Sequence, residues 1–248
     1  MIPTDVRALA RSGLLVSPMC LGTMTFDAGR WGVDHAGADG IVNAYVATGG
    51  NFVDTADIYG GGQSEAMIGA CVAARALRDR LVVATRFTWN RDPGNPNAGG
   101  NGRKHILSAV EASLRRLRTD YIDLCCVRFR DMVTPVEEVW QTLGDLVRSG
   151  RIRCFTPSDV PAWDATRMTV LAAEGGVPAP VAIQTEYSLT ERTAEQEIVP
   201  AARECGMGAL PWSPLAGGFL DGAYSRRMQP GRRRAQRRGT AGRSRPVR

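Results

Sequence analysis

Lysine and histidine are nearly absent from this chain. Lys104 is the single lysine among 31 basic residues, and His35 and His105 are the only histidines. The six cysteines show no CxxC spacing, so neither a zinc site nor a disulfide scaffold is expected. Buried reduced thiols are the better interpretation of these cysteines.

Long apolar runs are absent as well. No stretch is long enough to span a bilayer, and the N-terminus lacks the charged segment and apolar run of a secretory signal. We therefore expect a cytoplasmic protein with no membrane partner. With 248 residues, 44% of them hydrophobic and 23% charged, the chain has the composition of a globular protein and a length that single α/β barrels commonly occupy.

Acidic residues are missing from the C-terminal tail. Ten arginines and no acid lie in residues 225–248, and removing those ten charges from the net charge of +6 leaves −4 on residues 1–224. The basic balance therefore belongs to the tail and not to the body. An arginine-rich arm can bind nucleic-acid phosphates, but no aromatic residues are interleaved with these arginines, which disfavours a nucleic-acid partner.

Apolar segments of strand length alternate with segments of helix length along the body of the chain. A short hairpin is expected at residues 7–17, with its turn at 11–13. The expected strands are unbroken apolar runs, which is typical of a parallel sheet buried on both faces. Repeated βα units favour a (β/α)8 TIM barrel over an open sheet, here incomplete, with about seven units in residues 1–224. We expect strands at 19–24, 52–54, 81–85, 121–127, 152–155, 181–184 and 207–212, and helices at 36–48, from an N-cap at Ser64, and at 104–117, 135–148, 161–174 and 195–205.

Polar side chains follow the expected strands one after another. In a (β/α)8 barrel these positions share the carboxyl-terminal face, where active sites are built. One polar strand end could arise by chance, but repetition on one face predicts a site. The loop at residues 89–103, rich in Asn, Gly and Pro, lies on the same face and is expected to shape the substrate entrance. The polar positions are Asp54, Arg86, Arg128, Ser158 with Asp159, Gln184, and Trp212 with Ser213.

Residues 51–60 carry the strongest chemical signal. Asp54 ends an apolar strand and Tyr59 follows five residues later, so a returning loop can bring the carboxylate and the phenol together. A phenol is a useful general acid when a nearby cation lowers its pKa, so a basic partner is expected from another strand. Taken alone, the pattern fits a structural Asp and a rim Tyr better. The polar residues at the other strand ends reverse that balance.

Five stretches, in order along the chain, resemble the aldo-keto reductase family. They are FVDTADIYG at 52–60, YIDL at 121–124, GRIR at 150–153, QTEYSL at 184–189 and PWSPLAGGFL at 211–220. Each stretch alone is a weak signal, but jointly they are specific, and the resemblance covers roughly residues 7–224. It implies that small-molecule aldehydes or ketones are reduced with NADPH inside a (β/α)8 barrel.

The resemblance also implies a catalytic tetrad of Asp, Tyr, Lys and His. Asp54 matches the tetrad Asp, and Tyr59 matches the proton donor. Arg86 occupies the lysine position at the end of the third strand, and Arg128 occupies the histidine position after the fourth. Neither histidine of the chain lies at a point of the repeat where it could substitute. The expected catalytic residues are therefore Asp54, Tyr59, Arg86 and Arg128.

For the cofactor, the resemblance places Ser158 and Gln184 at the nicotinamide carboxamide and Trp212 against the ring. The alternative for Trp212 is an aromatic that only fills the core. Asp159 stands where Asn is common in the family. The expected contacts to NADP are Thr23, Asp54, Ser158, Asp159, Gln184, Trp212, Ser213, Leu215 and Gly217, the last three of them around the pyrophosphate.

Arginine at two tetrad positions changes the expected chemistry. Arg86 keeps the charge of lysine and can hold Asp54 through two hydrogen bonds, but its bulkier, planar group shifts the geometry at Tyr59. Arg128 adds a permanent cation where a neutral imidazole would donate one hydrogen bond. Three interpretations stay open: a lower pKa of Tyr59, an anionic group on the substrate, or drift in a gene no longer selected for activity.

The tail departs from the family pattern. The family continues with a helix, an eighth strand and a segment that binds the 2′-phosphate, whereas residues 225–248 have no apolar periodicity. We expect a frameshifted or truncated C-terminus, with phosphate binding by the arginines as the alternative. The leading hypothesis is an NADPH-dependent oxidoreductase whose activity is impaired or altered. The alternative is a non-catalytic barrel that binds a ligand or a partner.

Overall fold

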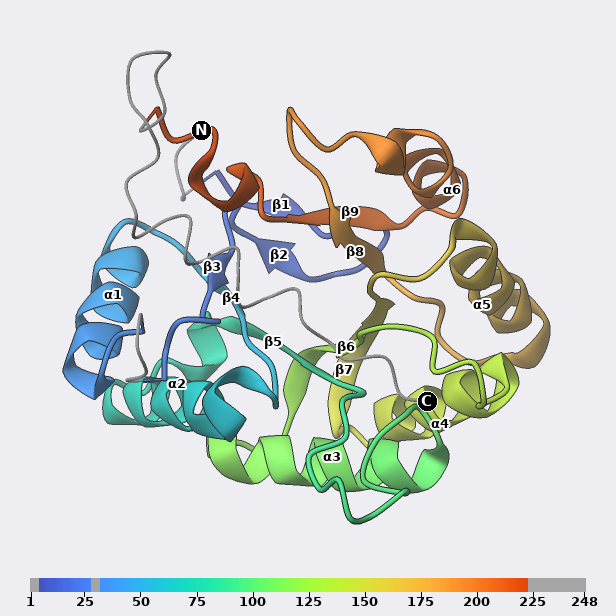
Figure 1. Ribbon diagram of the computed structural model, residues 1–248, viewed down its shortest axis with the longest axis horizontal. Helices are drawn as coiled ribbons and strands as arrows, with labels where there is room; N and C mark the ends of the chain where they lie inside the picture. Colours follow the sequence, from blue (N-terminus) through green and yellow to red (C-terminus); the bar gives the residue numbers. More distant parts are fainter. Residues whose placement is uncertain (1–4, 28–31, 223–248) are drawn as a thin grey trace.

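The computed structural model describes residues 5–27 and 32–222, in which helices surround a group of parallel strands (Figure 1). The strands are β1 (Arg7–Ala8), β2 (Leu15–Val16), β3 (Leu21–Gly22), β4 (Phe52–Asp54), β5 (Val82–Phe87), β6 (Ile122–Val127), β7 (Ile152–Pro157), β8 (Ala182–Glu186) and β9 (Gly208–Trp212). The helices are α1 (His35–Ala47), α2 (Gln63–Ala74), α3 (Arg103–Leu117), α4 (Val136–Arg148), α5 (Ala162–Gly175) and α6 (Ile198–Glu204). From β3 to β9 strands and helices alternate without interruption, as the sequence predicts.

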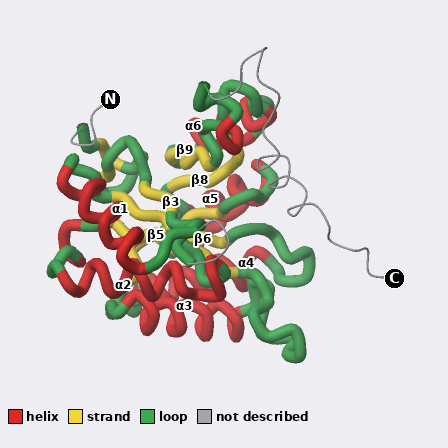
Figure 2. The backbone as a smooth tube through the Cα atoms, turned by 60° about the vertical axis from the view of Figure 1, so that its left-hand side comes forward, coloured by secondary structure: helices red, strands yellow, loops and turns green. Residues whose placement is uncertain are grey.

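The parallel strands form two sheets that adjoin between β7 and β8. The first sheet has the order β3-β4-β5-β6-β7, and β8 pairs with β9 in the second. A parallel bridge between Ser158 and Gln184, just past the end of β7, joins the two sheets. Figure 2 shows the strands in the interior and the helices outside them. The predicted parallel α/β architecture is confirmed, but within the described residues β3 and β9 do not pair and the strands do not close into a ring.

The central strands bury both of their faces, because successive side chains point alternately toward the helices and toward the inside. Every residue of β5 and of β6 is buried. This explains why these strands appear in the sequence as continuous apolar runs. The outer layer includes Val53, Val83, Cys125, Phe155, Ile106 and Leu143. The inner layer comprises Phe52, Val82, Ala84, Leu124, Cys126 and Ala182, together with Leu9 and Val16.

The predicted hairpin is confirmed: β1 and β2 pair antiparallel. Asn51, directly before β4, anchors it. The side-chain oxygen of Asn51 accepts a hydrogen bond from the N–H of Ser17 (2.6 Å), and its amide donates to the carbonyl oxygen of Leu15 (2.9 Å). Leu9 and Val16 belong to the inner layer. The hairpin therefore covers the amino ends of the inner strands and leaves their carboxyl ends to polar side chains.

The prediction that Ser64 is an N-cap is wrong. Helix α2 begins at Gln63, and its N-cap is Gly62, whose φ of 97° favours glycine. The hydroxyl of Ser64 instead points inward and shares hydrogen bonds with the hydroxyls of Thr23 (2.8 Å) and Thr55 (2.9 Å). A serine near a helix start was therefore recruited to tie β3, β4 and α2 together.

Two other predicted elements are shorter in the structure. The strand expected at 19–24 is reduced to β3, because the chain turns at Thr23, whose carbonyl oxygen accepts from the N–H of Phe26 (3.0 Å). The helix expected at 195–205 starts only at Ile198, because Glu197 has a non-helical φ of −141°. The tail at residues 225–248 lies outside the described residues.

The six cysteines are free thiols. Cys71, Cys125 and Cys126 are buried as predicted, Cys154 and Cys205 are only half-buried, and Cys20 is exposed, so the prediction of buried thiols is wrong for Cys20. Within residues 5–27 and 32–222, no cluster of three or more His, Cys, Asp or Glu side chains could hold a metal ion. No helix in the same residues is long and apolar enough to cross a membrane.

Gly69 lets α2 lie close to the end of α3. A Cβ atom on Gly69 would lie 2.5 Å from the carbonyl oxygen of Arg116 and 2.7 Å from that of Leu117, which are backbone atoms that cannot rotate away. We expect Gly69→Ala to lower the free energy of unfolding by about 1–3 kcal/mol, the usual cost of overpacking.

Gly40→Ala in α1 is the matched control, because a Cβ atom there meets nothing within 4 Å. This change should raise the free energy of unfolding by up to about 1 kcal/mol, since alanine favours helix. Urea titrations of both variants measure the two effects. Stabilisation by both substitutions would show that α2 moves away from α3 at little cost.

Candidate active site

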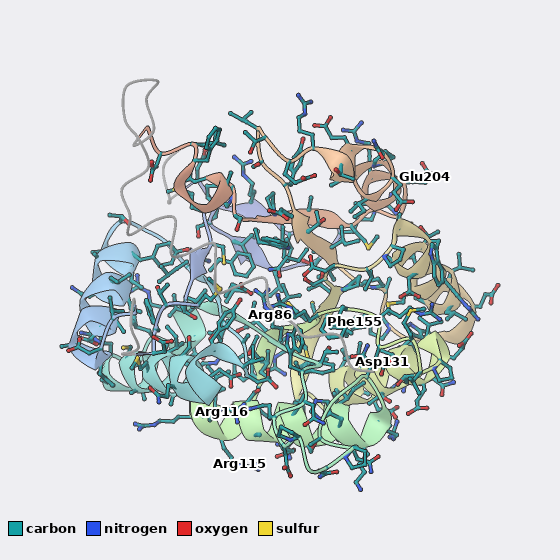
Figure 3. All side chains as sticks on the ribbon, in the orientation of Figure 1. Arg86, Arg115, Arg116, Asp131, Phe155 and Glu204 are labelled. Carbon is teal, nitrogen blue, oxygen red and sulfur yellow. The ribbon has the colours of Figure 1, made fainter. Side chains whose placement is uncertain are left out.

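The polar side chains at the carboxyl ends of the strands form two adjoining groups. Arg86, at the end of β5, lies near the centre of the molecule inside the arc of helices (Figure 3). The first, which we name the tyrosine cluster, consists of Asp54, Tyr59, Arg86 and Arg128. The amide group consists of Ser158, Asp159, Gln184 and Trp212. The structure therefore brings together all eight of these predicted residues at the end of the strands opposite the hairpin.

Tyr59 is positioned by a loop that is bound to β5. The strand β4 ends at Asp54, and three residues later Asp57 donates its backbone N–H to the carbonyl oxygen of Arg86 (3.0 Å). Gly60 then adopts a left-handed conformation (φ 55°) that turns the chain toward α2. As a result, the guanidinium carbon of Arg86 lies 5.7 Å from the centre of the Tyr59 ring.

Asp54 and Arg86 form a buried ion pair, with side chains 16% and 5% exposed. Arg86 Nη2 donates to Asp54 Oδ2, while Arg86 Nε and Asp54 Oδ1 have no hydrogen-bond partner among the described residues. Burial raises the pKa of Asp54, and the charge of Arg86 and the nearby amide of Gln184 offset part of that rise. Burial also opposes the charge of Arg86, but Asp54 and Tyr59 outweigh it and the pKa of Arg86 is raised. The pair fixes a cation beside the phenol.

Tyr59 is a half-buried phenol that faces two cations. Burial raises its pKa above the ordinary value, and the neighbouring charge of Asp54 adds to that rise. The charges of Arg86 and Arg128 lower it. The net shift is upward, so the hydroxyl keeps its proton at neutral pH while two cations lie ready to stabilise the anion.

Arg128 follows β6 and connects the tyrosine cluster to an aromatic rim formed by Trp89 and Phe129. Its backbone N–H donates to the hydroxyl of Thr88 (3.3 Å), and its guanidinium carbon lies 5.9 Å from the centre of the Trp89 ring. Trp89 is 43% exposed and contacts Phe129 edge to face, with ring centres 5.0 Å apart. Within the described residues Arg128 forms no ion pair.

The amide group is linked by hydrogen bonds between side chains. The hydroxyl of Ser158 donates to the side-chain oxygen of Gln184 (3.2 Å), and both residues are buried. The indole Nε1 of Trp212 donates to Asp159 Oδ1 (2.8 Å), which fixes the orientation of the ring. Asp159 has a positive φ of 54° and donates its backbone N–H to the carbonyl oxygen of Gln184 (3.0 Å).

The turn after β9 has an unusual backbone. Ser213, Ala216 and Gly217 all have positive φ values, of 52°, 50° and 63°. A Cβ atom on Gly217 would meet nothing within 4 Å, and Leu215 is 54% exposed. The N–H groups of Ala216 and Gly218 donate within the turn, to the carbonyl oxygens of Ser213 (2.8 Å) and Leu215 (2.9 Å), and the concave backbone of such turns can receive an anion.

Thr23 lies beneath the tyrosine cluster. Its side chain is fully buried, and its hydroxyl donates to the carbonyl oxygen of Asp54 (3.1 Å). The backbone N–H of Thr23 bonds the same oxygen (3.0 Å). Thr23 therefore supports the end of β4 from within the protein.

Asp57, a buried acid within the loop that carries Tyr59, is not among the predicted site residues. Asp57 is 1% exposed, and neither carboxylate oxygen has a hydrogen-bond partner among the described residues. Burial and the negative charge of Glu65 raise the pKa of Asp57 to about 7, against the lowering effect of Arg91 and Arg116. Glu65 itself is fully buried and accepts from Arg116 Nε (2.6 Å). The available signal was an acid flanked by apolar residues in a short loop.

Asp57→Asn tests this burial through the pH dependence of stability. The folded pKa is about 7 and the ordinary value is 3.8, so the folded protein binds this proton more tightly than the unfolded chain does. The resulting stabilisation is present at low pH and is lost as pH rises from about 4 to about 7. Relative to Asp57→Asn, the wild type should lose roughly 2–4 kcal/mol of unfolding free energy across that range.

Urea unfolding at several pH values measures this difference. The exposed Asp92→Asn variant is the control and should follow the wild type throughout. A wild type and an Asp57→Asn variant with parallel pH profiles would contradict the assignment.

Comparison with known proteins gives a consistent result. The family model described as the aldo/keto reductase family matches residues 18–243, so the match extends past residue 224, where the resemblance read from the sequence ended. The chain is 38% identical over 216 residues to norsolorinic acid reductase of Aspergillus flavus, covering 84% of this chain and 56% of that protein. It is thus similar to a fungal reductase but spans only a little over half of its length.

Two further relatives extend the comparison. The chain is 38% identical over 225 residues to the uncharacterized oxidoreductase YrpG of Bacillus subtilis, covering 86% of this chain and 67% of that protein. It is 34% identical over 234 residues to an aryl-alcohol dehydrogenase (NADP(+)) of Phanerodontia chrysosporium, covering 88% of this chain and 61% of that protein. These relatives are oxidoreductases by name.

Proposed function

The chain belongs to the aldo/keto reductase family, and on that premise we propose that it reduces an aldehyde or ketone with NADPH, Tyr59 donating the proton to the carbonyl oxygen. The observation that carries the proposal is the placement of Tyr59. Its protonated phenol lies against the Arg86 guanidinium at the carboxyl ends of the strands. We also propose that the two sheets are parts of one (β/α)8 barrel wall, which the inner apolar layer and the surrounding helices support.

The residues of the amide group fit a nicotinamide cofactor. Ser158 and Gln184 are buried polar side chains at the strand ends, with the donors and acceptors that a carboxamide needs. Trp212 offers a flat ring held in place by a hydrogen bond, and the open turn at Gly217 leaves room for phosphate oxygens. When bound, NADPH supplies the hydride that adds to the carbonyl carbon. The name of one relative includes NADP(+), which supports this choice of cofactor.

The tyrosine cluster then supplies the proton. Tyr59 O–H donates to the carbonyl oxygen, and the charge of Arg86 stabilises the tyrosinate that remains. Asp54 holds the guanidinium of Arg86 in place through the buried ion pair. Burial keeps the proton on Tyr59 before reaction, and the adjacent cations reduce the free-energy cost of releasing it.

Tyr59→Phe tests the proton donor. Removing the hydroxyl should lower the rate of single-turnover hydride transfer to an aldehyde by about 10²- to 10⁴-fold, the usual contribution of a positioned general acid. Binding of NADPH should be unchanged, because the amide group is intact.

Tyr121→Phe is the matched control, since Tyr121 precedes β6 at the opposite end of the strands. Stopped-flow absorbance at saturating NADPH separates chemistry from cofactor binding. A Tyr59→Phe variant that transfers hydride as fast as the wild type would rule out Tyr59 as the donor. A wild type that binds NADPH but reduces no aldehyde or ketone would rule out the proposed activity.

Arg86→Lys tests the role of the guanidinium. Because lysine retains the charge and the pairing with Asp54, only the geometry at Tyr59 changes, and we expect a rise of roughly 2- to 10-fold in the single-turnover rate. Arg130→Lys, the same chemical change outside the tyrosine cluster, is the control and should not change the single-turnover rate. A fall of more than about tenfold for Arg86→Lys would mean that the reaction depends on the planar guanidinium itself.

A further inference from the structure

The tyrosine cluster contains two arginines, Arg86 and Arg128, and a single carboxylate, Asp54. Asp54 pairs with Arg86. Asp159, the acid of the adjoining amide group, accepts a hydrogen bond from the indole of Trp212 and its charge acts on Arg86, but it forms no ion pair with Arg128. Arg128 therefore has a guanidinium beside Tyr59 with no carboxylate partner among the described residues.

We infer that Arg128 binds a carboxylate attached directly to the carbonyl carbon of the substrate, so that this protein reduces 2-oxo acids. This inference rests on the proposed reaction. The carbonyl oxygen must lie at the hydroxyl of Tyr59. Arg128 directly follows Val127, which pairs with Phe87 next to Arg86, and its charge acts on that same hydroxyl. A carboxylate on the adjacent carbon atom then falls within reach of the guanidinium, whose planar fork matches carboxylate geometry with two hydrogen bonds.

The aromatic rim indicates what lies on the other side of the carbonyl. Trp89 is 43% exposed, packs edge to face on Phe129, and lies beside Arg128. A flat apolar substituent can pack against these rings while the carboxylate binds Arg128. Phenylglyoxylate combines both features and is the probe of choice.

The reaction balances with the cofactor already named. The carbonyl carbon accepts the hydride of NADPH, which is oxidised to NADP⁺, and the carbonyl oxygen accepts the proton of Tyr59. The product is a 2-hydroxy acid, its carboxylate is unchanged, and solvent returns a proton to Tyr59. Arg128 binds the carboxylate, positions the substrate and selects for charge, in addition to the stabilisation that its charge gives to the tyrosinate.

The test compares phenylglyoxylate with its neutral methyl ester in steady-state kinetics. The wild type should prefer the acid in kcat/KM by about 10- to 100-fold, the range expected for one charged pair of hydrogen bonds. Arg128→Gln removes a cation beside Tyr59 and should lower kcat/KM for both substrates, but the loss for the acid should exceed the loss for the ester by about 10- to 100-fold, so that the preference disappears. Arg130→Gln removes an equal charge two residues away and should leave the preference intact.

Calorimetric titration of phenylglyoxylate into the protein with NADP⁺ is the second measurement, because it does not require turnover. Arg128→Gln should weaken this binding by about tenfold or more. If that variant does not fold, Arg128→Lys replaces it and should weaken binding of the acid more than binding of the ester.

The outcomes separate the inference from the proposed reaction. Turnover of acid and ester at equal rates, or equal losses for both in Arg128→Gln, would overturn the inference and leave the reductase standing. Binding of phenylglyoxylate that depends on Arg128 without any turnover would support the anion site and rule out the reaction. If the protein showed no turnover and no binding of phenylglyoxylate, both the inference and the proposed reaction would be overturned.

Discussion

A buried ion pair between Asp54 and Arg86 determines the geometry of the whole tyrosine cluster. Removing two charges from water costs several kcal/mol per ion, and their attraction offsets this only when the geometry is held rigidly. Here the rigidity comes from the pairing of β4 with β5, which places Asp54 opposite Ala84, two residues before Arg86. Loss of either partner would leave an uncompensated charge beneath Tyr59.

The same backbone pairing also holds the proton donor. Because Asp57 donates its N–H to the carbonyl oxygen of Arg86, the loop that carries Tyr59 is attached to the strand that carries the cation. The phenol and the guanidinium therefore share one piece of framework. Substitution of lysine by arginine at this position retains the framework and the charge and changes only the shape of the cation.

Most of the fold could be predicted from the sequence because strands buried on two faces appear as continuous apolar runs. The strand-end residues could be predicted too, since parallel strands bring their carboxyl ends to one edge. The cap at Gly62 could not, because it depends on a left-handed backbone that a nearby serine conceals. Asp57 was missed because its environment includes Arg116 of α3, which is distant in sequence, as well as Glu65 of the neighbouring α2, and a local sequence pattern does not show such tertiary contacts.

The hairpin at the amino end has a consequence for how substitutions act. Leu9 and Val16 form a floor under the inner layer, so that end of the strands is filled with apolar side chains and offers no chemistry. Changes near this floor, or in the ion pair between Arg78 and Asp123 at the amino end of β6, act on folding. Changes at the opposite rim act on recognition, with little shared ground. The two ends of the strands can therefore diverge independently, one constrained by stability and the other by the ligand.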